Sequence, residues 1–116
     1  MMPVVTHEGL VGYISRLDGP YADVTLVVDG EARVPVVVEE TQSNGILSGT
    51  GELDRYGCRI EHLRPNVDDV RVGHHILTSG RDDVYPRNIL VGTIAGITRR
   101  GARQLQEVEV QPAVDF

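Results

Sequence analysis

Apolar residues alternate with polar ones along most of this chain, and turn-forming residues interrupt the alternation at short intervals. The segments "VPVVV" at 34–38 and "CRIEH" at 58–62 both show a two-residue apolar spacing. This spacing places apolar side chains on one face of a β-strand. Nowhere does an apolar stripe with the 3.6-residue period of a helix persist for three turns. The sequence therefore predicts an all-β fold.

Composition agrees with many short strands and limits the function. Thirteen of the 116 residues are glycine, and the apolar residues are mainly valine, isoleucine and leucine. The net charge of −6 argues against nucleic acid or an anionic membrane surface as the main partner. The chain contains no lysine, which excludes Schiff-base and P-loop chemistry, and its single cysteine excludes an internal disulfide. No segment reaches the length of a transmembrane helix.

Turn residues mark three reversals. Asp18-Gly19-Pro20 predicts a turn that closes a strand beginning near Leu10. Asp29-Gly30 between the valine-rich runs 24–28 and 34–38 predicts a β-hairpin with a type I′ turn, in which Gly30 has positive φ. Asn44-Gly45 predicts a further turn. The remaining strands are expected near residues 46–48, 56–62, 76–78, 90–97 and 108–110.

The chain contains an internal echo. Val5-Thr6 corresponds to Leu77-Thr78, and Leu10-Val11-Gly12 corresponds to Leu90-Val91-Gly92, with a longer turn in the second copy. Matches this short can arise by chance, but their physical interpretation is a pair of similar strand-turn-strand units. Gly12 and Gly92 are then expected where a strand bends sharply or another backbone comes close.

Ordered segments of the chain resemble the extracytoplasmic β domain of the MreC family of rod-shape-determining proteins. They are "MPVVTHEGLVGYI", "VTLVVDGEARVPVVVEET", "NGILSGTG", "VRVGHHILTSG", "YPRNILVGTI" and "VEVQPAVDF". The sequence departs from the family at His74, where an acidic residue is usual, and in the charged turn "SGRDDVYP". The resemblance implies two small interlocked β-barrels, the first similar to a chymotrypsin-like barrel without its catalytic residues.

The resemblance also implies a function. MreC proteins are non-catalytic scaffolds of the bacterial elongation machinery, which builds peptidoglycan and sets cell shape. Family members self-associate and engage MreD, MreB and the elongation-specific penicillin-binding transpeptidase. The family's cytoplasmic tail, transmembrane helix and coiled coil are not recognisable here, so we expect a fragment of a longer protein located at the extracytoplasmic, or periplasmic, face of the cell membrane.

The path of the chain between two barrels has two interpretations. Residues 1–116 form one MreC-type unit, within which 21–63 could form one sub-barrel and 1–20 plus 71–116 the other. This division places the two echoing units in the same sub-barrel. The alternative is a plain split near Arg64-Pro65, in the most polar stretch of the chain.

The histidine- and serine-containing stretch near His74 raises the alternative of a small hydrolase on a protease-like barrel. A triad needs a histidine beside a serine and a carboxylate, and His74, His75 and Ser79 supply the residue types. However, no nucleophile-elbow motif surrounds Ser48 or Ser79. Adjacent histidines of a strand point to opposite faces, which argues against a shared metal ion. We therefore predict no enzyme activity, no cofactor and no metal; a barrel that binds a small molecule is a third interpretation.

The turn that lengthens the second echo is the candidate partner-binding segment. It carries Tyr85 and Arg87, and tyrosine and arginine supply much of the energy at protein interfaces. The alternative is that this turn is merely a solvated loop tip.

Overall fold

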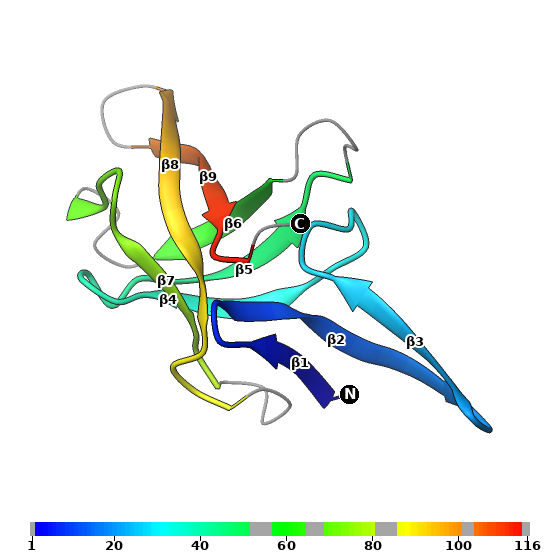
Figure 1. The fold of residues 1–116 in the computed structure, drawn as a ribbon. Coiled ribbons are helices and arrows are strands. Elements are labelled where there is room, and N and C mark those ends of the chain that lie inside the picture. Colours follow the sequence, from blue (N-terminus) through cyan, green and yellow to red (C-terminus); the bar gives the residue numbers. More distant parts are fainter. Residues whose placement is uncertain (1, 52–56, 65–68, 81–85, 101–103, 115–116) are drawn as a thin grey trace.

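The computed structural model describes residues 2–51, 57–64, 69–80, 86–100 and 104–114. These residues form nine β-strands and no α-helix, so the all-β prediction is confirmed. The strands are β1 (Met2–Thr6), β2 (Gly9–Asp18), β3 (Tyr21–Leu26), β4 (Val34–Val38), β5 (Asn44–Gly49), β6 (Cys58–Arg64), β7 (His75–Thr78), β8 (Leu90–Arg100) and β9 (Gln104–Pro112). They divide into a barrel and a smaller sheet beside it (Figure 1).

Strands β4 to β9 form a closed antiparallel barrel with the order β4-β5-β6-β9-β8-β7. The sequence alternation explains its core, because every second side chain of a strand points to the same face. Val34, Val36 and Val38 of β4 are fully buried, while the residues between them are partly exposed. Ile76 of β7 and Ile94 of β8 are buried as well. Closure pairs every strand of the barrel on both sides.

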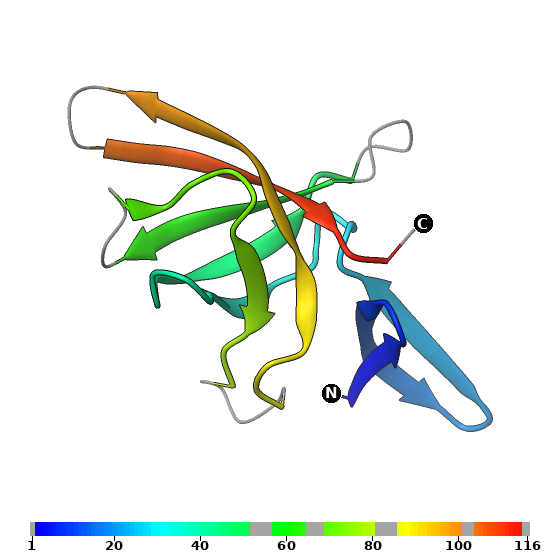
Figure 2. The ribbon, with the colours of Figure 1, turned by 60° about the vertical axis from the view of Figure 1, so that its left-hand side comes forward.

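Strands β1, β2 and β3 form a separate antiparallel sheet with β2 in the middle. Figure 2 shows this sheet beside the barrel, with the β2–β3 hairpin reaching away from it. Gly9 at the start of β2 lies against β8, since a Cβ at this position would be 2.4 Å from the Leu90 carbonyl oxygen. Leu10 and Val27 belong to the same buried cluster as Val91 of the barrel. The sheet and the barrel therefore share one core.

The expectation of two interlocked barrels holds only in part. Among the described residues one barrel is closed, and the other strands form an open sheet. The strands also distribute differently from the expected sub-barrels: β4 to β6, from the segment 21–63, close a barrel with β7 to β9, from 71–116. Strand β3 of the same segment instead joins strands of 1–20. The segment 21–63 does not form one sub-barrel because the chain leaves the open sheet after β3 and enters the closed barrel with β4.

The predicted hairpin around Asp29-Gly30 is wrong, because β3 pairs with β2 whereas β4 pairs with β5 and β7. Val27 and Val28 are both buried, so the alternation ends before the turn. The N–H groups of Gly49 and Gly51 donate to the carbonyls of Asp29 and Val28 at 3.1 and 3.0 Å. Gly30 does not adopt positive φ, so no type I′ turn forms. This segment crosses between sheets and packs on the end of β5.

The other two predicted reversals have opposite outcomes. The turn at Asp18-Gly19-Pro20 is confirmed, since Asp18 pairs with Tyr21 and Gly19 has a φ of 59°. The turn at Asn44-Gly45 is misplaced, because both residues lie inside β5. The chain reverses just before them, where Gln42 has a φ of 60° and its N–H donates to the Val38 carbonyl at 2.8 Å.

The internal echo corresponds to a structural repeat, in which β1-β2-β3 matches β7-β8-β9. Val4 pairs with Gly12 and Val5 with Leu10 in the first unit; Ile76 pairs with Gly92 and Leu77 with Leu90 in the second. In both units the register shifts at the same step, between Val4 and Val5 and between Ile76 and Leu77. The echo therefore reflects two hairpins with the same register and the same bulge.

The repeat continues into the third strand of each unit. Ile14 pairs with Val24 in the first unit and Ile94 with Val110 in the second, and each pair is followed by a register shift. Both glycines lie where the neighbouring backbone comes close. A Cβ at Gly12 would lie 2.1 Å from the Thr25 carbonyl oxygen, and a Cβ at Gly92 would lie 2.2 Å from the Gln111 carbonyl oxygen.

Candidate interaction surface

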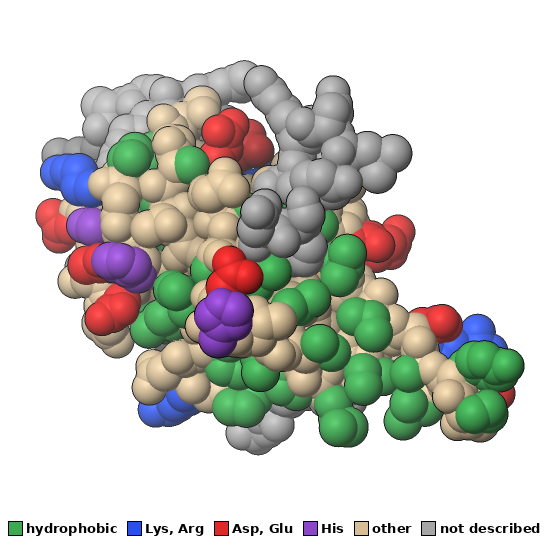
Figure 3. All heavy atoms as spheres, viewed as in Figure 1, with side chains coloured by type: hydrophobic (Ala, Val, Ile, Leu, Met, Phe, Trp, Pro, Cys, Tyr) green, Lys and Arg blue, Asp and Glu red, His purple; other side chains and the backbone are tan. Residues whose placement is uncertain are grey.

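The open sheet carries most of the exposed large apolar side chains of the described chain. Six of the nine such side chains belong to β1, β2 and β3, namely Met2, Val5, Leu17, Tyr21, Val24 and Leu26. Figure 3 shows apolar side chains gathered over the lower part of the molecule and out along the β2–β3 hairpin. Because monomeric proteins rarely leave contiguous apolar area exposed, this sheet is a candidate interaction surface.

In the repeat, the exposed face of the open sheet corresponds to the face of β7-β8-β9 that lies inside the barrel. Val24 of β3 is 46% exposed, whereas the corresponding Val110 of β9 is 2% exposed inside the barrel. Ile14 of β2 is partly exposed, whereas the corresponding Ile94 is buried. The open sheet thus presents side chains that the second unit keeps in the barrel interior. We call this set of residues, Met2, Val4, Ile14, Val24 and Leu26, the open face.

The edges of the sheet are open as well. In the described part of the chain, β1 and β3 each pair with β2 alone. Their counterparts β7 and β9 are paired on both sides, with β4 and β6 as the additional neighbours. Exposed strand edges present backbone groups that can pair with another strand.

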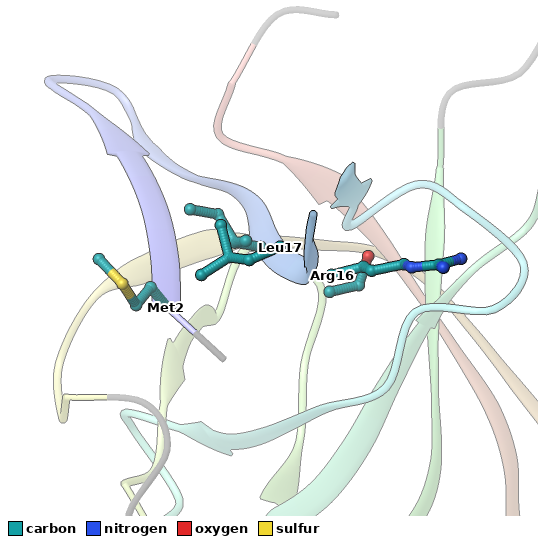
Figure 4. A pocket seen from close by; sticks show the side chains of 5 residues that line it. Met2, Arg16 and Leu17 are labelled. Atoms are coloured by element: carbon teal, nitrogen blue, oxygen red, sulfur yellow. The ribbon is translucent and has the colours of Figure 1, made fainter. Parts of the chain in front are cut away.

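Two shallow pockets lie on the β2–β3 hairpin. The first is lined by Met2, Ile14, Ser15, Arg16 and Leu17, and the second by Arg16, Asp18, Tyr21 and Asp23. In the first pocket the side chains of Met2 and Leu17 lie to one side, and the Arg16 side chain runs away from them (Figure 4). The hairpin therefore combines an apolar side with a side of mixed charge.

Of the two predicted partner-binding residues, Tyr85 lies outside the described residues. Arg87 is exposed, and its side chain covers Gly80, where a Cβ would lie 2.4 Å from the Arg87 Cγ. Buried Thr78 anchors the end of this loop: its hydroxyl donates to the Pro86 carbonyl at 2.6 Å and accepts from the Ile89 N–H at 2.9 Å. The described end of the loop is thus held to β7.

The two adjacent histidines have separate partners. The Nδ1 of His74 accepts a hydrogen bond from the Arg71 N–H at 3.2 Å. The ring of His75 donates from Nδ1 to the Glu40 carboxylate at 2.7 Å, and its backbone N–H donates to the same carboxylate at 2.8 Å. The hydrogen bond from the His75 ring to Glu40 and the charge of Glu40 raise the pKa of His75. Burial alone would raise the pKa of Glu40, but the hydrogen bonds from His75 lower it on balance.

The serines do not assemble a nucleophilic site in the described part of the chain. Ser48 is buried in β5, and Ser43 shares a hydrogen bond with Thr41 at 2.7 Å. The Ser79 hydroxyl oxygen is buried without a hydrogen-bond partner. The Cys58 thiol donates to the Val27 carbonyl, and burial raises its pKa to about 12, which removes it as a nucleophile at neutral pH. In the described part of the chain, no group of three or more histidine, cysteine, aspartate or glutamate side chains could hold a metal ion.

Sequence reasoning missed both the open face and the Glu40–His75 pair. The open face was missed because Val24 and Leu26 have the alternation of any half-buried strand, and alternation does not reveal whether a covering layer exists. The Glu40–His75 contact joins residues 35 positions apart, and no local pattern indicates it. The echo indicated the repeat, but the difference in burial between its two copies is visible only in the structure.

Comparisons with known proteins agree with this fold. A family model described as "Rod shape-determining protein MreC, barrel core" matches residues 1–116. The cell shape-determining protein MreC of Caulobacter vibrioides is 33% identical over 90 residues, which are 78% of this chain and 25% of that protein. The chain spans 25% to 30% of the length of the curated relatives that it matches.

Solved structures show the same architecture. A structure of MreC from "Lysteria monocytogenes" superposes with a TM-score of 0.83 at 26% identity, covering 98% of this chain and 55% of that one. MreC in a "Complex between Penicillin-Binding Protein (PBP2) and MreC from Helicobacter pylori" superposes with a TM-score of 0.74 at 18% identity, covering 95% and 66%. In the described part of this chain no helix is long and apolar enough to cross a membrane.

Proposed function

Because the chain belongs to the MreC family, we propose that it is a non-catalytic scaffold of the bacterial elongation machinery. The observation that carries this proposal is the match of the family model for the MreC barrel core to residues 1–116. The exposed β2–β3 hairpin and the exposed Arg87 offer surface for binding to other proteins. Ser43, His74, His75 and Cys58 are held in separate structural contacts, which supports the absence of catalysis.

We infer that the elongation-specific penicillin-binding transpeptidase is one partner. The support is the Helicobacter pylori structure, a complex between PBP2 and an MreC that shares this fold. The candidate docking segments on this chain are the turn with Tyr85 and Arg87 and the tip of the β2–β3 hairpin. MreD and MreB are further partners that the family implies.

The place of action that we propose is the extracytoplasmic side of the cell membrane. The support is membership in a family for which one similar structure is the major periplasmic domain from the cell shape-determining filament MreC. Attachment to the membrane would come from a segment outside residues 1–116. Self-association of the scaffold also belongs to this proposal.

We further infer that the open sheet is one half of a second barrel. The support is the repeat: β7-β8-β9 has the same registers and bulges, and it is one half of the closed barrel. The other half of this second barrel would come from strands outside residues 1–116.

Binding of the purified chain to the extracytoplasmic part of the transpeptidase tests the scaffold function. We expect saturable binding by calorimetry that an unrelated β-barrel protein of similar charge does not reproduce. Treatment with a serine-directed activity probe tests the alternative of a small hydrolase, and we expect no labelling at Ser48 or Ser79. Covalent labelling at either serine would contradict the scaffold function.

A further inference from the structure

Thr78, at the end of β7, holds the two peptide groups that flank Arg87. The Thr78 hydroxyl donates to the Pro86 carbonyl at 2.6 Å, and the Asn88 N–H donates to the Thr78 carbonyl at 3.0 Å. Thr78 itself is fully buried, in a strand that pairs with the start of β8 (Figure 1). The backbone of Arg87 is therefore anchored to the barrel, although the residue is exposed.

Gly80 provides a seat for the stem of the Arg87 side chain. A Cβ at position 80 would lie 2.4 Å from the Arg87 Cγ, 3.4 Å from its Nε and 3.5 Å from its Cβ. The side chain thus lies over the bare backbone of Gly80 from its first carbon to the guanidinium. Gly80 has a φ of 69°, which costs glycine little and other residues more. A larger residue at position 80 would both strain the backbone and displace Arg87.

The Arg87 guanidinium forms no ion pair within the described part of the chain, where the salt bridges join other residues. A guanidinium donates two parallel hydrogen bonds to a carboxylate, which makes arginine well suited to recognise this group. A side chain that is held in place before binding also loses less conformational entropy when the partner arrives. Backbone anchor and glycine seat together prepare Arg87 for a contact outside the described chain.

We propose that Gly80 is a positioning residue for partner binding, which seats Arg87 so that its guanidinium meets a carboxylate side chain of a protein partner. The inference rests on the proposed function, in which the turn with Arg87 is a candidate docking segment, and it assigns the chemical group that Arg87 recognises. One arginine on a chain with a net charge of −6 suits a single carboxylate. A polyanion such as nucleic acid would need a basic patch.

Two alanine variants separate the seat from the strain in the backbone. Gly80→Ala places a Cβ where the Arg87 stem lies, so that stem has to move. Gly73→Ala is the matched control, because Gly73 also has positive φ, at 95°. Beyond its chain neighbours, no heavy atom of the described chain lies within 4 Å of a Cβ added to Gly73. Both variants thus strain the backbone, and only Gly80→Ala displaces Arg87.

Nitrogen-15 relaxation of the Arg87 Nε–H group tests the seat without any partner. Gly80→Ala should lower the order parameter of this group to that of a mobile group, below about 0.6, whereas Gly73→Ala should leave it unchanged. The resonance is assigned by its absence in Arg87→Ala. If Gly80→Ala fails to fold, the unsubstituted chain decides, since its Arg87 Nε–H should be more ordered than that of Arg64, an exposed arginine at the end of β6.

Calorimetry with the extracytoplasmic part of the transpeptidase tests the contact. Gly80→Ala should weaken binding about fivefold, and Gly73→Ala should leave the affinity unchanged. In a chain that already carries Arg87→Ala, Gly80→Ala should cause no further loss, because its effect acts through Arg87. Arg87→Glu should bind more weakly than Arg87→Ala, since it places a carboxylate against the carboxylate of the partner.

Three results would overturn the inference. The first is an Arg87 Nε–H group that is equally ordered in Gly80→Ala and in the unsubstituted chain. The second is an equal loss of affinity from Gly80→Ala with and without the Arg87 side chain, and the third is equal binding by Arg87→Glu and Arg87→Ala. Binding that is the same in every variant would overturn this inference alone, whereas no binding by the unsubstituted chain would contradict the proposed function.

Discussion

The Glu40 carboxylate accepts two hydrogen bonds from His75, one from the backbone N–H at 2.8 Å and one from ring Nδ1 at 2.7 Å. Glu40 lies in the turn between β4 and β5, and His75 begins β7. Next to this contact the Glu39 N–H donates to the His75 carbonyl at 2.9 Å. The pair therefore extends the seam that closes the barrel between β4 and β7 beyond its last ladder pair, Val38 with Ile76.

This pair makes the seam dependent on pH. The pKa of His75 is raised in the folded state, chiefly by the hydrogen bond from its ring to Glu40 and by the charge of Glu40, with a smaller contribution from Glu39. A raised pKa stabilises the fold fully below the unfolded value of 6.5, and this contribution is lost as the pH rises through the folded value. The pKa of Glu40 is lowered, so its contribution is present above 4.5 and is lost as the pH falls through the folded value.

NMR titration of the His75 ring checks this first prediction. We expect a midpoint above 6.5 in the unsubstituted chain and a lower midpoint in Glu40→Gln. Glutamine keeps an acceptor for the His75 N–H but removes the charge. The comparison of Glu40→Gln with the unsubstituted chain therefore separates the effect of the charge from that of the hydrogen-bond geometry. Glu61→Gln, at an exposed position of β6, is the control and should leave the His75 midpoint unchanged. Equal midpoints with and without the Glu40 charge would contradict the prediction.

The two glycines of the repeat should not tolerate a branched side chain. We expect Gly12→Val and Gly92→Val each to lower the free energy of unfolding by ~1–3 kcal/mol, because the new Cβ would overlap a carbonyl oxygen of the neighbouring strand. Urea denaturation followed by circular dichroism measures the change. If both variants have the same free energy of unfolding as the unsubstituted chain, the close approach of the backbones at these glycines does not limit the side chain.

Gly30 should behave differently from these two. The chain there has no positive φ, and the nearest heavy atom to an added Cβ is the Gly51 Cα at 4.0 Å. We therefore expect Gly30→Ala to change the free energy of unfolding by less than about 0.5 kcal/mol. A type I′ hairpin turn would instead make this substitution costly, because alanine disfavours positive φ. The same urea experiment decides between the crossing segment and the hairpin.

The strands were predictable where local pattern determines them, and the pairing of strands was not. Alternation located β4, β6 and β8 because each has one face against a core. The same alternation in β3 and β4, separated by Asp29-Gly30, favoured a hairpin, although the two strands belong to different sheets. The choice depends on contacts of Val27 and Val28 with distant residues, which a local pattern does not contain. The echo predicted the repeat because both units need glycine at the same bulge-associated site.

The turn with Tyr85 and Arg87 stays a predicted binding segment. Replacing both residues with alanine should weaken binding to the transpeptidase by about tenfold or more, since tyrosine and arginine are frequent hot spots. The melting temperature should change little, because Arg87 is exposed. The comparison variant is Arg16→Ala with Tyr21→Ala at the tip of the β2–β3 hairpin, the second candidate docking segment, where both residues are exposed. Calorimetry compares the two variants, and loss of binding only in the hairpin variant would contradict the prediction and place the docking site on the hairpin.

Thr78 should hold the described end of that loop to the barrel. Its fully buried hydroxyl donates to the Pro86 carbonyl and accepts from the Ile89 N–H, while its backbone pairs with Ile89 and Asn88. Thr78→Val preserves shape but leaves one partly buried donor, the Ile89 N–H, and one acceptor, the Pro86 carbonyl, without their partner, so we expect a loss of about 1–3 kcal/mol in the free energy of unfolding. Thr98→Val, on an exposed position of β8, is the control and should be nearly neutral. Hydrogen exchange should show faster exchange of the Ile89 amide in Thr78→Val, and an unchanged rate would mean that the hydroxyl does not hold the loop.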